Sequence, residues 1–141
     1  MSVARISPAE ALERVREQGY AYLDVRTVEE FALGHPEGAY NIPLRHMAAG
    51  GMQPNPRFLE EVKARFAPDA KLVVGCASGV RSLQAAEQLL AEGYPEVVEQ
   101  RAGYSGVTDP FGRVTEPGWQ ALGLPCATTA QPGRSYAELK F

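Results

Sequence analysis

The fold class is decided by one stretch, Lys71-Leu72-Val73-Val74-Gly75-Cys76-Ala77-Ser78-Gly79-Val80-Arg81-Ser82. The run from Leu72 to Gly75 is short and continuously apolar, as expected of a strand buried on both faces of a parallel sheet. From Ser82 to Glu92 the apolar residues recur at helical spacing, and Gly93 is a typical helix stop. A buried strand, a tight loop and a helix therefore follow one another, which predicts an α/β protein.

The same alternation extends outward from this stretch. Ser7-Pro8-Ala9-Glu10 and Thr27-Val28-Glu29-Glu30 are capping boxes, and each predicts the start of a helix. Apolar spacing predicts helices over about 8–18, 28–33, 56–66 and 82–92, and strands over 20–25, 39–43, 71–75 and 97–98. Strands separated by helices of this length favour parallel strands with helices on both faces of the sheet.

Two segments show little regular pattern. Arg45 to Pro56 contains Gly50-Gly51 and two prolines, so we expect an irregular connection there. Glycine and proline punctuate the chain after Gly103, which predicts loops, a short helix near Trp119 and a loosely held end. The chain is thus read as one domain over 1–141, with a core over about 3–107 and a loop-rich C-terminal extension over 108–141.

The composition excludes several classes of protein. Apolar residues make up 45% and charged residues 22%, the balance of a globular domain. The net charge of -3 and the lack of a basic run argue against a nucleic-acid partner, and no apolar stretch approaches the roughly 20 residues of a membrane span. The start of the chain lacks the apolar core of a secretory signal, so we expect a cytoplasmic, reducing location.

The cysteines and histidines are too few and too scattered for a structural zinc site, and no metal or other cofactor is expected. Cys76 and Cys126 could pair, but a reducing location makes a disulfide the less favoured interpretation. A free thiol at Cys76 would lie where a parallel strand ends, at the sheet edge where ligands of α/β proteins bind. Loop amides, the following helix N-terminus and Arg81 would favour its thiolate and hold an anionic donor such as thiosulfate.

A buried packing cysteine is the alternative for Cys76. Its position argues against that interpretation, because Gly79 permits a tight turn and Arg81 brings a charge beside the thiol. A thiolate here could attack the outer sulfur of a donor, carry it as a persulfide and pass it to a thiol or cyanide.

At this point a family resemblance becomes clear. Cys76, Gly79, Arg81 and Ser82 resemble the Cys-x-x-Gly-x-Arg-Ser active loop of single-domain rhodaneses. Other matching pieces, in chain order, are Asp24-Val25-Arg26, Glu30-Phe31, Gly34-His35, Gly38-Ala39, Asn41-Ile42-Pro43, Gly93-Tyr94, Val97-Val98 and Gly103. The resemblance covers roughly the first three quarters of the chain. One departure is Ala102-Gly103-Tyr104-Ser105-Gly106, which stands where the family often has Gly-Gly and a nearby Trp, and it indicates a longer loop near the site.

The resemblance implies a three-layer α/β domain with a five-stranded parallel sheet between helices. It also implies a sulfurtransferase that moves sulfur from a thiosulfate-like donor to a thiol, to cyanide or to a protein acceptor. Cys76 and Arg81 are the expected catalytic residues. The expected substrate-binding residues are Ala77, Ser78, Gly79, Val80, Ser82 and Arg26.

Two rival functions remain. Phosphatases and arsenate reductases of related folds also wrap a Cys…Arg loop round an oxyanion. Their loops have five residues between the cysteine and the arginine, whereas this chain has four, from Ala77 to Val80. The smaller ring suits a sulfur atom better than a phosphate. The second rival is a non-catalytic sulfur-carrier or binding module of the same fold. Such modules usually lack the cysteine, so the presence of Cys76, Gly79 and Arg81 together favours an enzyme.

Several other residues have both structural and functional interpretations. We interpret Asp24, Arg26 and Glu30 as fixing the helix that follows their strand, with Arg26 at the pocket mouth. His35 is expected to bond loop backbone rather than to transfer a proton. Cys126 has no charged neighbour in the sequence, which favours a bystander thiol over a relay cysteine. Tyr104 and Phe111 could wall the pocket or simply pack.

Overall fold

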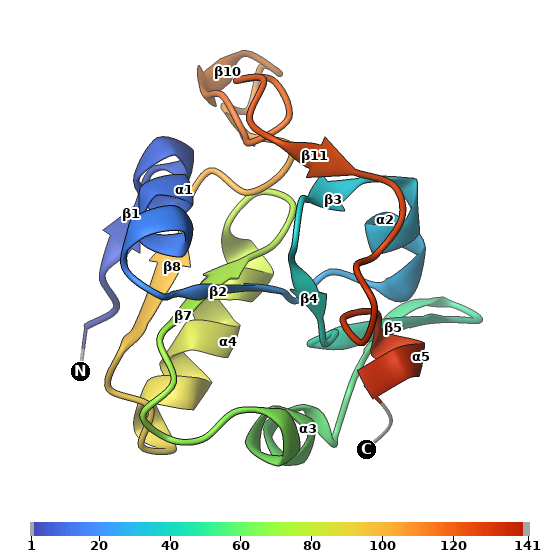
Figure 1. Ribbon diagram of the computed structural model, residues 1–141. Helices are drawn as coiled ribbons and strands as arrows, with labels where there is room; N and C mark the ends of the chain where they lie inside the picture. Colours follow the sequence, from blue (N-terminus) through green and yellow to red (C-terminus); the bar gives the residue numbers. More distant parts are fainter. Residues whose placement is uncertain (1, 140–141) are drawn as a thin grey trace.

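A parallel sheet of five strands forms the centre of the computed structural model, which describes residues 2–139 (Figure 1). Its strands, in spatial order, are β1 (Arg5–Ile6), β8 (Val97–Gln100), β7 (Leu72–Gly75), β2 (Ala21–Asp24) and β4 (Tyr40–Asn41). All four neighbouring pairs are parallel. The prediction of a five-stranded parallel sheet is therefore confirmed, although β1 was not foreseen because only two residues form it.

Helices cover both faces of the sheet, as predicted. They are α1 (Pro8–Glu17), α2 (Val28–Leu33), α3 (Phe58–Arg65) and α4 (Val80–Ala91). Leu72 and Val74 pack in the apolar cluster that contains α3 and α4, whereas Val73 packs in the cluster that contains α1 and α2. This alternation is the period-two pattern of a strand buried on both faces, and it gives three layers.

The capping boxes form as predicted. The Ser7 hydroxyl accepts a hydrogen bond from the Glu10 amide, and the Glu10 carboxylate accepts one from the Ser7 amide. Thr27 and Glu30 repeat the arrangement at the start of α2. Helix α4 begins at Val80, two residues before the predicted start, because Gly79 is its N-cap at φ +91°, a left-handed conformation that glycine adopts without strain.

The segment after β4 is a regular hairpin, so the prediction of an irregular connection is wrong. Strands β5 (Arg45–Ala48) and β6 (Gly51–Pro54) pair antiparallel in full register. The two residues Ala49 and Gly50 make the tight turn between them, and Gly50 adopts φ +91°. The side chains of both strands are mostly exposed, so the alternation of apolar and polar residues that announces a strand is absent.

The extension after residue 107 is tied to the core, so the prediction of a loosely held end is wrong for the residues described. Its elements are the hairpin β9 (Val107–Thr108) and β10 (Val114–Glu116), the strand β11 (Cys126–Ala127), which pairs with β3 (His35–Pro36), and α5 (Tyr136–Leu139). Arg134 donates to the Gly38 carbonyl at 2.8 Å and the Tyr136 hydroxyl to Glu61 at 2.6 Å. Trp119 is buried in a turn rather than in the predicted helix.

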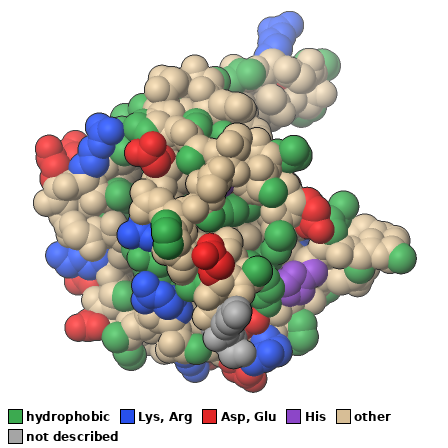
Figure 2. Space-filling view, turned by 45° about the vertical axis from the view of Figure 1, so that its right-hand side comes forward, with side chains coloured by type: hydrophobic (Ala, Val, Ile, Leu, Met, Phe, Trp, Pro, Cys, Tyr) green, Lys and Arg blue, Asp and Glu red, His purple; other side chains and the backbone are tan. Residues whose placement is uncertain are grey.

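The surface carries charges of both signs. On the face in Figure 2, acidic and basic side chains are interspersed with apolar ones and form no single-sign patch. Within residues 2–139, no helix has the length and apolar character that crossing a bilayer requires.

Candidate active site

Cys76 lies directly after β7, at the carboxyl edge of the parallel sheet. Its side chain is buried, and the Gly79 amide donates a hydrogen bond to its sulfur at 3.2 Å. The left-handed conformation of Gly79 turns this amide inward, and a Cβ there would overlap the carbonyl of Arg101. The loop therefore presents a backbone donor to the sulfur, as an anionic sulfur requires.

The segment after β8 holds the loop in this shape. The amides of Tyr104 and Ser105 donate to the carbonyls of Cys76 and Ala77, each at 2.8 Å. Gly103 makes the approach possible, since a Cβ at this position would overlap the backbone of Ala77. The carbonyls of Cys76 and Ala77 are thus engaged by the neighbouring segment.

An ion pair with a buried carboxylate lies beneath the loop. Cys76 Sγ contacts Ser82 Oγ at 3.3 Å, and Ser82 Oγ donates to Glu99 Oε2 at 2.5 Å. Glu99 is fully buried on β8, and its other oxygen accepts from Arg5 Nε at 2.6 Å. Arg5 also donates to the Gly79 carbonyl at 3.2 Å. Neither Arg5 nor Glu99 was foreseen from the sequence.

A second ion pair lies on the outer side of the loop. Arg81 donates to the two carboxylate oxygens of Glu30 at 2.7 and 3.0 Å. Although burial opposes the shift, hydrogen bonds from Arg81 and Thr27 lower the pKa of Glu30 to about 2. The same contact raises the pKa of Arg81. Arg81 is therefore a fixed cation beside the loop, and its predicted contact with a donor stays a prediction.

Arg26 is buried behind this outer pair. Its guanidinium donates hydrogen bonds to the Asp24 carboxylate at 2.8 to 3.1 Å and to the Gly34 carbonyl, so it fixes the end of α2. Its guanidinium lies 4.5 Å from the Tyr104 ring centroid. Although burial opposes the shift, the Asp24 carboxylate raises the pKa of Arg26. Arg26, Glu30 and Tyr104 line a hollow of about 300 Å³, which places Arg26 at a pocket wall.

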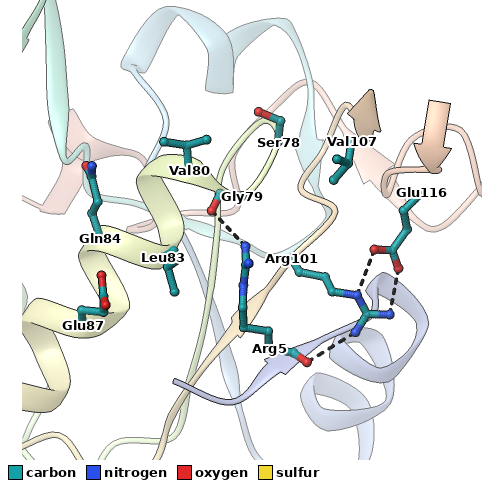
Figure 3. Close-up of a pocket in the computed structure, with 10 residues that line it drawn as sticks. All are labelled: Arg5, Ser78, Gly79, Val80, Leu83, Gln84, Glu87, Arg101, Val107 and Glu116. Atoms are coloured by element: carbon teal, nitrogen blue, oxygen red, sulfur yellow. Dashed lines mark hydrogen bonds and ion pairs between the residues drawn. The ribbon is translucent and has the colours of Figure 1, made fainter. Parts of the chain in front are cut away.

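A larger cleft, of about 550 Å³, opens on the other side of the loop (Figure 3). Ser78, Gly79 and Val80 line it together with one side of α4, and Arg5 and Arg101 reach it from the sheet edge. Figure 3 shows Arg5 bonded to the loop carbonyl and Arg101 bonded to Glu116. Three of the predicted binding residues thus face one cleft, whereas Cys76, Ala77, Arg81 and Ser82 line none of the described pockets.

The remaining candidates separate clearly. His35 is buried, and its Nδ1 lies 2.8 Å from the Phe31 carbonyl, so it contacts backbone as predicted, although this backbone belongs to α2 rather than to a loop. Cys126 is exposed and lines a separate hollow with Tyr104. Phe111 is 85% exposed and packs against no core, whereas Tyr104 is buried. Within residues 2–139, no three His, Cys, Asp or Glu side chains gather as a metal site requires.

The chain matches the model of the Rhodanese-like domain over residues 7–109 and belongs to that family. It is 47% identical over 87 residues to thiosulfate sulfurtransferase 16, chloroplastic, of Arabidopsis thaliana, a match that covers 62% of this chain and 72% of the relative. It is also 44% identical over 91 residues to the protein HIGH ARSENIC CONTENT 1, mitochondrial, of the same plant. This match covers 64% of this chain and 54% of the relative.

Among solved structures, the chain resembles Rv0390 from M. tuberculosis. The TM-score is 0.76 at 26% identity, and the match covers 92% of this chain and 100% of the other. The matched segment spans only about half the length of several curated relatives, for example 53% and 56% of two plant proteins. The likeness therefore shows the family and the fold, and the activity of each whole relative belongs to that relative.

Proposed function

We propose that the protein is a sulfurtransferase that carries sulfane sulfur as a persulfide on Cys76. One observation carries the proposal: Cys76 directly follows a parallel strand, and its sulfur accepts a hydrogen bond from the Gly79 amide within a Cys-x-x-Gly-x-Arg-Ser loop. A buried sulfur among backbone donors suits an anionic thiolate or persulfide. The similarity to a relative named thiosulfate sulfurtransferase supports the same activity.

The reaction requires two displacements. The Cys76 thiolate attacks the outer sulfur of thiosulfate, a Cys76 S–S bond forms, the S–S bond of thiosulfate breaks, and sulfite leaves with the bonding electron pair. Cyanide or a thiolate then attacks the outer sulfur of the persulfide, and the Cys76 thiolate leaves. Arg81, beside the loop, and the loop residues Ala77 to Ser82 would hold the anionic donor.

The test uses the mass of the intact protein. Thiosulfate should add one sulfur atom to the protein, and cyanide or a small thiol should remove it. Cys76→Ser should take up no sulfur while its circular dichroism stays that of the wild type, and Cys126→Ser should load normally. Sulfur uptake by Cys76→Ser, or no uptake by the wild type from any of several donors, would contradict the proposal.

Arsenate reduction is the second candidate, because a relative at 44% identity bears the name HIGH ARSENIC CONTENT 1. The same loop could hold an oxyanion at the Cys76 sulfur. With four residues between Cys76 and Arg81, however, the ring is smaller than the one found round tetrahedral oxyanions. Arsenite production from arsenate and a thiol, dependent on Cys76 and without persulfide formation under any donor, would favour this candidate.

The location and the natural acceptor are part of the proposal. A cytoplasmic pool of small thiols, or a protein thiol, would take the sulfur from Cys76. Competition between acceptors, measured as the rate at which each removes sulfur from the loaded protein, tests this part. A protein acceptor that removes sulfur no faster than a small thiol at equal concentration would contradict a dedicated protein partner.

A further inference from the structure

A continuous hydrogen-bonded chain joins the Cys76 sulfur to the carboxylate of Glu99. Cys76 Sγ lies 3.3 Å from Ser82 Oγ, and Ser82 Oγ lies 2.5 Å from Glu99 Oε2. The side chains of Cys76, Ser82 and Glu99 are 2%, 0% and 0% exposed. Protons can therefore pass between sulfur and carboxylate through one hydroxyl, without bulk water.

The direction of each hydrogen bond follows from the chemistry of the groups. A carboxylate only accepts, so the single proton of the Ser82 hydroxyl points to Glu99. The lone pairs of Ser82 Oγ then face the sulfur, and the Cys76 thiol donates to them. In this state Ser82 cannot donate to a thiolate. Ser82 can donate a hydrogen bond to a Cys76 thiolate only if both hydrogen bonds, Cys76–Ser82 and Ser82–Glu99, reverse direction.

We propose that Glu99 takes the proton of the Cys76 thiol through Ser82. The S–H proton moves to Ser82 Oγ while the proton of Ser82 moves to Glu99 Oε2, so the hydroxyl is regenerated and the negative charge passes to sulfur. Glu99 then donates to Ser82 Oγ, and Ser82 donates to the thiolate. Glu99 acts through Ser82 and is a positioning residue. The inference rests on the proposed function only in naming the Cys76 thiolate as the nucleophile.

Arg5 keeps the carboxyl group of Glu99 in place during this exchange. Its Nε holds Oε1, the oxygen that takes no proton, and its Nη2 holds the Gly79 carbonyl. One side chain thus contacts both the proton acceptor and the backbone of Gly79, whose amide donates to Cys76. Arg101 in turn donates to the Arg5 carbonyl at 3.3 Å and connects Arg5 to the surface of the cleft.

Charged groups on other elements also act on Cys76. Arg81 on α4 interacts electrostatically with Cys76 and with Asp24 on β2, and Glu30 on α2 neutralises much of its charge. Tyr22 on β2 also interacts electrostatically with Cys76, but burial raises the pKa of Tyr22 and keeps it uncharged. None of these groups belongs to the hydrogen-bonded chain from Cys76 through Ser82 to Glu99. They remain constant when Glu99 alone is changed, which makes its effect separable.

Two explanations of Glu99 predict opposite results. If Glu99 acted only as a nearby negative charge, its removal would make the Cys76 thiolate easier to form and alkylation in acid faster. If Glu99 takes the proton, the thiol and the carboxylate share one proton over a range of pH, and the thiolate fraction stays constant there. Removing Glu99 would then abolish this plateau and slow alkylation in acid.

The experiment measures the rate at which iodoacetamide alkylates Cys76 as a function of pH, in a Cys126→Ser background. With Glu99 present, the rate should level off to a plateau on the acidic side. In Glu99→Gln, it should continue to fall about tenfold per pH unit. Glu116→Gln, which changes a carboxylate at the edge of the same cleft, should retain the plateau.

Identical profiles with and without Glu99, or faster acidic alkylation of Glu99→Gln, would overturn the proposal. Ser82→Ala provides a second route if Glu99→Gln does not fold, as judged by circular dichroism. It leaves the Arg5 ion pair intact and should also lose the plateau, and a retained plateau would overturn the Ser82 pathway. Alkylation needs no sulfur donor. A protein with the plateau that takes no sulfur from thiosulfate would therefore contradict the proposed function and support the proton transfer.

Discussion

Two arginine–glutamate pairs flank the Cys76 loop, and their carboxylates differ in burial. The inner carboxylate, Glu99, is 0% exposed and faces its partner Arg5 across two sheet strands. The outer carboxylate, Glu30, is 27% exposed and reaches Arg81 from a neighbouring helix. A buried charge depends on its polar partners inside the protein, whereas a charge near solvent is partly screened by water when its partner is lost. We therefore expect the Arg5–Glu99 pair to contribute mainly to stability and the Arg81–Glu30 pair mainly to substrate binding.

Removal of the inner cation should have the largest effect. Arg5→Ala takes the charged partner from the fully buried Glu99 carboxylate and leaves Ser82 as its remaining donor, which should lower the free energy of unfolding by about 2 kcal/mol. Urea denaturation of the variant and the wild type measures this difference. Arg101→Ala is the matched control, because its partner Glu116 is partly exposed and the loss should stay below about 1 kcal/mol. Equal losses in the two variants would show that burial of the carboxylate makes no difference.

Removal of the outer cation should act on the reaction more than on the fold. Arg81→Ala takes away the cation and leaves Glu30 to repel an anionic donor, so kcat/KM for thiosulfate should fall by about tenfold or more through KM. Steady-state transfer from thiosulfate to cyanide measures it. Arg81→Lys keeps the charge and should recover part of the loss. An unchanged KM in Arg81→Ala would show that Arg81 does not hold the donor.

The outer pair should also depend on pH. The pKa of Glu30 is lowered from 4.5 to about 2, so its stabilising effect is complete above pH 4.5 and is lost as the pH falls toward 2. Glu30→Gln should be slightly less stable than the wild type at neutral pH, and the difference should vanish across this window. Urea midpoints at several pH values test the prediction. A difference that grows with acidity would have the wrong sign.

The smallest effect is expected outside both pairs. Cys126 is exposed, and its thiol contacts the Leu124 carbonyl rather than the Cys76 loop. Cys126→Ser should therefore change the transfer rate by less than about twofold. It should change the free energy of unfolding by less than about 0.5 kcal/mol. Steady-state kinetics and urea denaturation provide both values. A large loss of transfer would give Cys126 a relay role.

Local signals in the sequence predicted most of the fold. The capping boxes at Ser7 and Thr27 involve residues three positions apart, so sequence alone locates them, and the apolar run at β7 requires burial wherever the chain goes. The hairpin after β4 escaped prediction because its side chains face solvent. Its one signal was the Gly50-Gly51 pair, which favours a tight hairpin turn as well as an irregular loop.

The site was predicted only in part, for a different reason. Cys76 and Gly79 are neighbours in the chain, and their spacing already implies a loop amide at the sulfur. Arg5 and Glu99 are 94 residues apart and meet only because β1 pairs with β8. A carboxylate beside Val97-Val98, in a strand predicted to be buried, was the available signal, since a buried charge requires a partner. The sequence does not say which partner.

The C-terminal extension also protects the sheet. Strand β4 lies at the edge of the sheet, where an outward backbone amide is a template for pairing with another chain. The Asn41 amide donates instead to the Arg134 carbonyl at 2.9 Å, and the Arg134 guanidinium lies 4.7 Å from the Tyr40 ring centroid. The returning chain thus occupies the position that a strand of a second molecule would take. In this fold, resistance to edge-to-edge aggregation comes from residues more than ninety positions away from the strand that they cover.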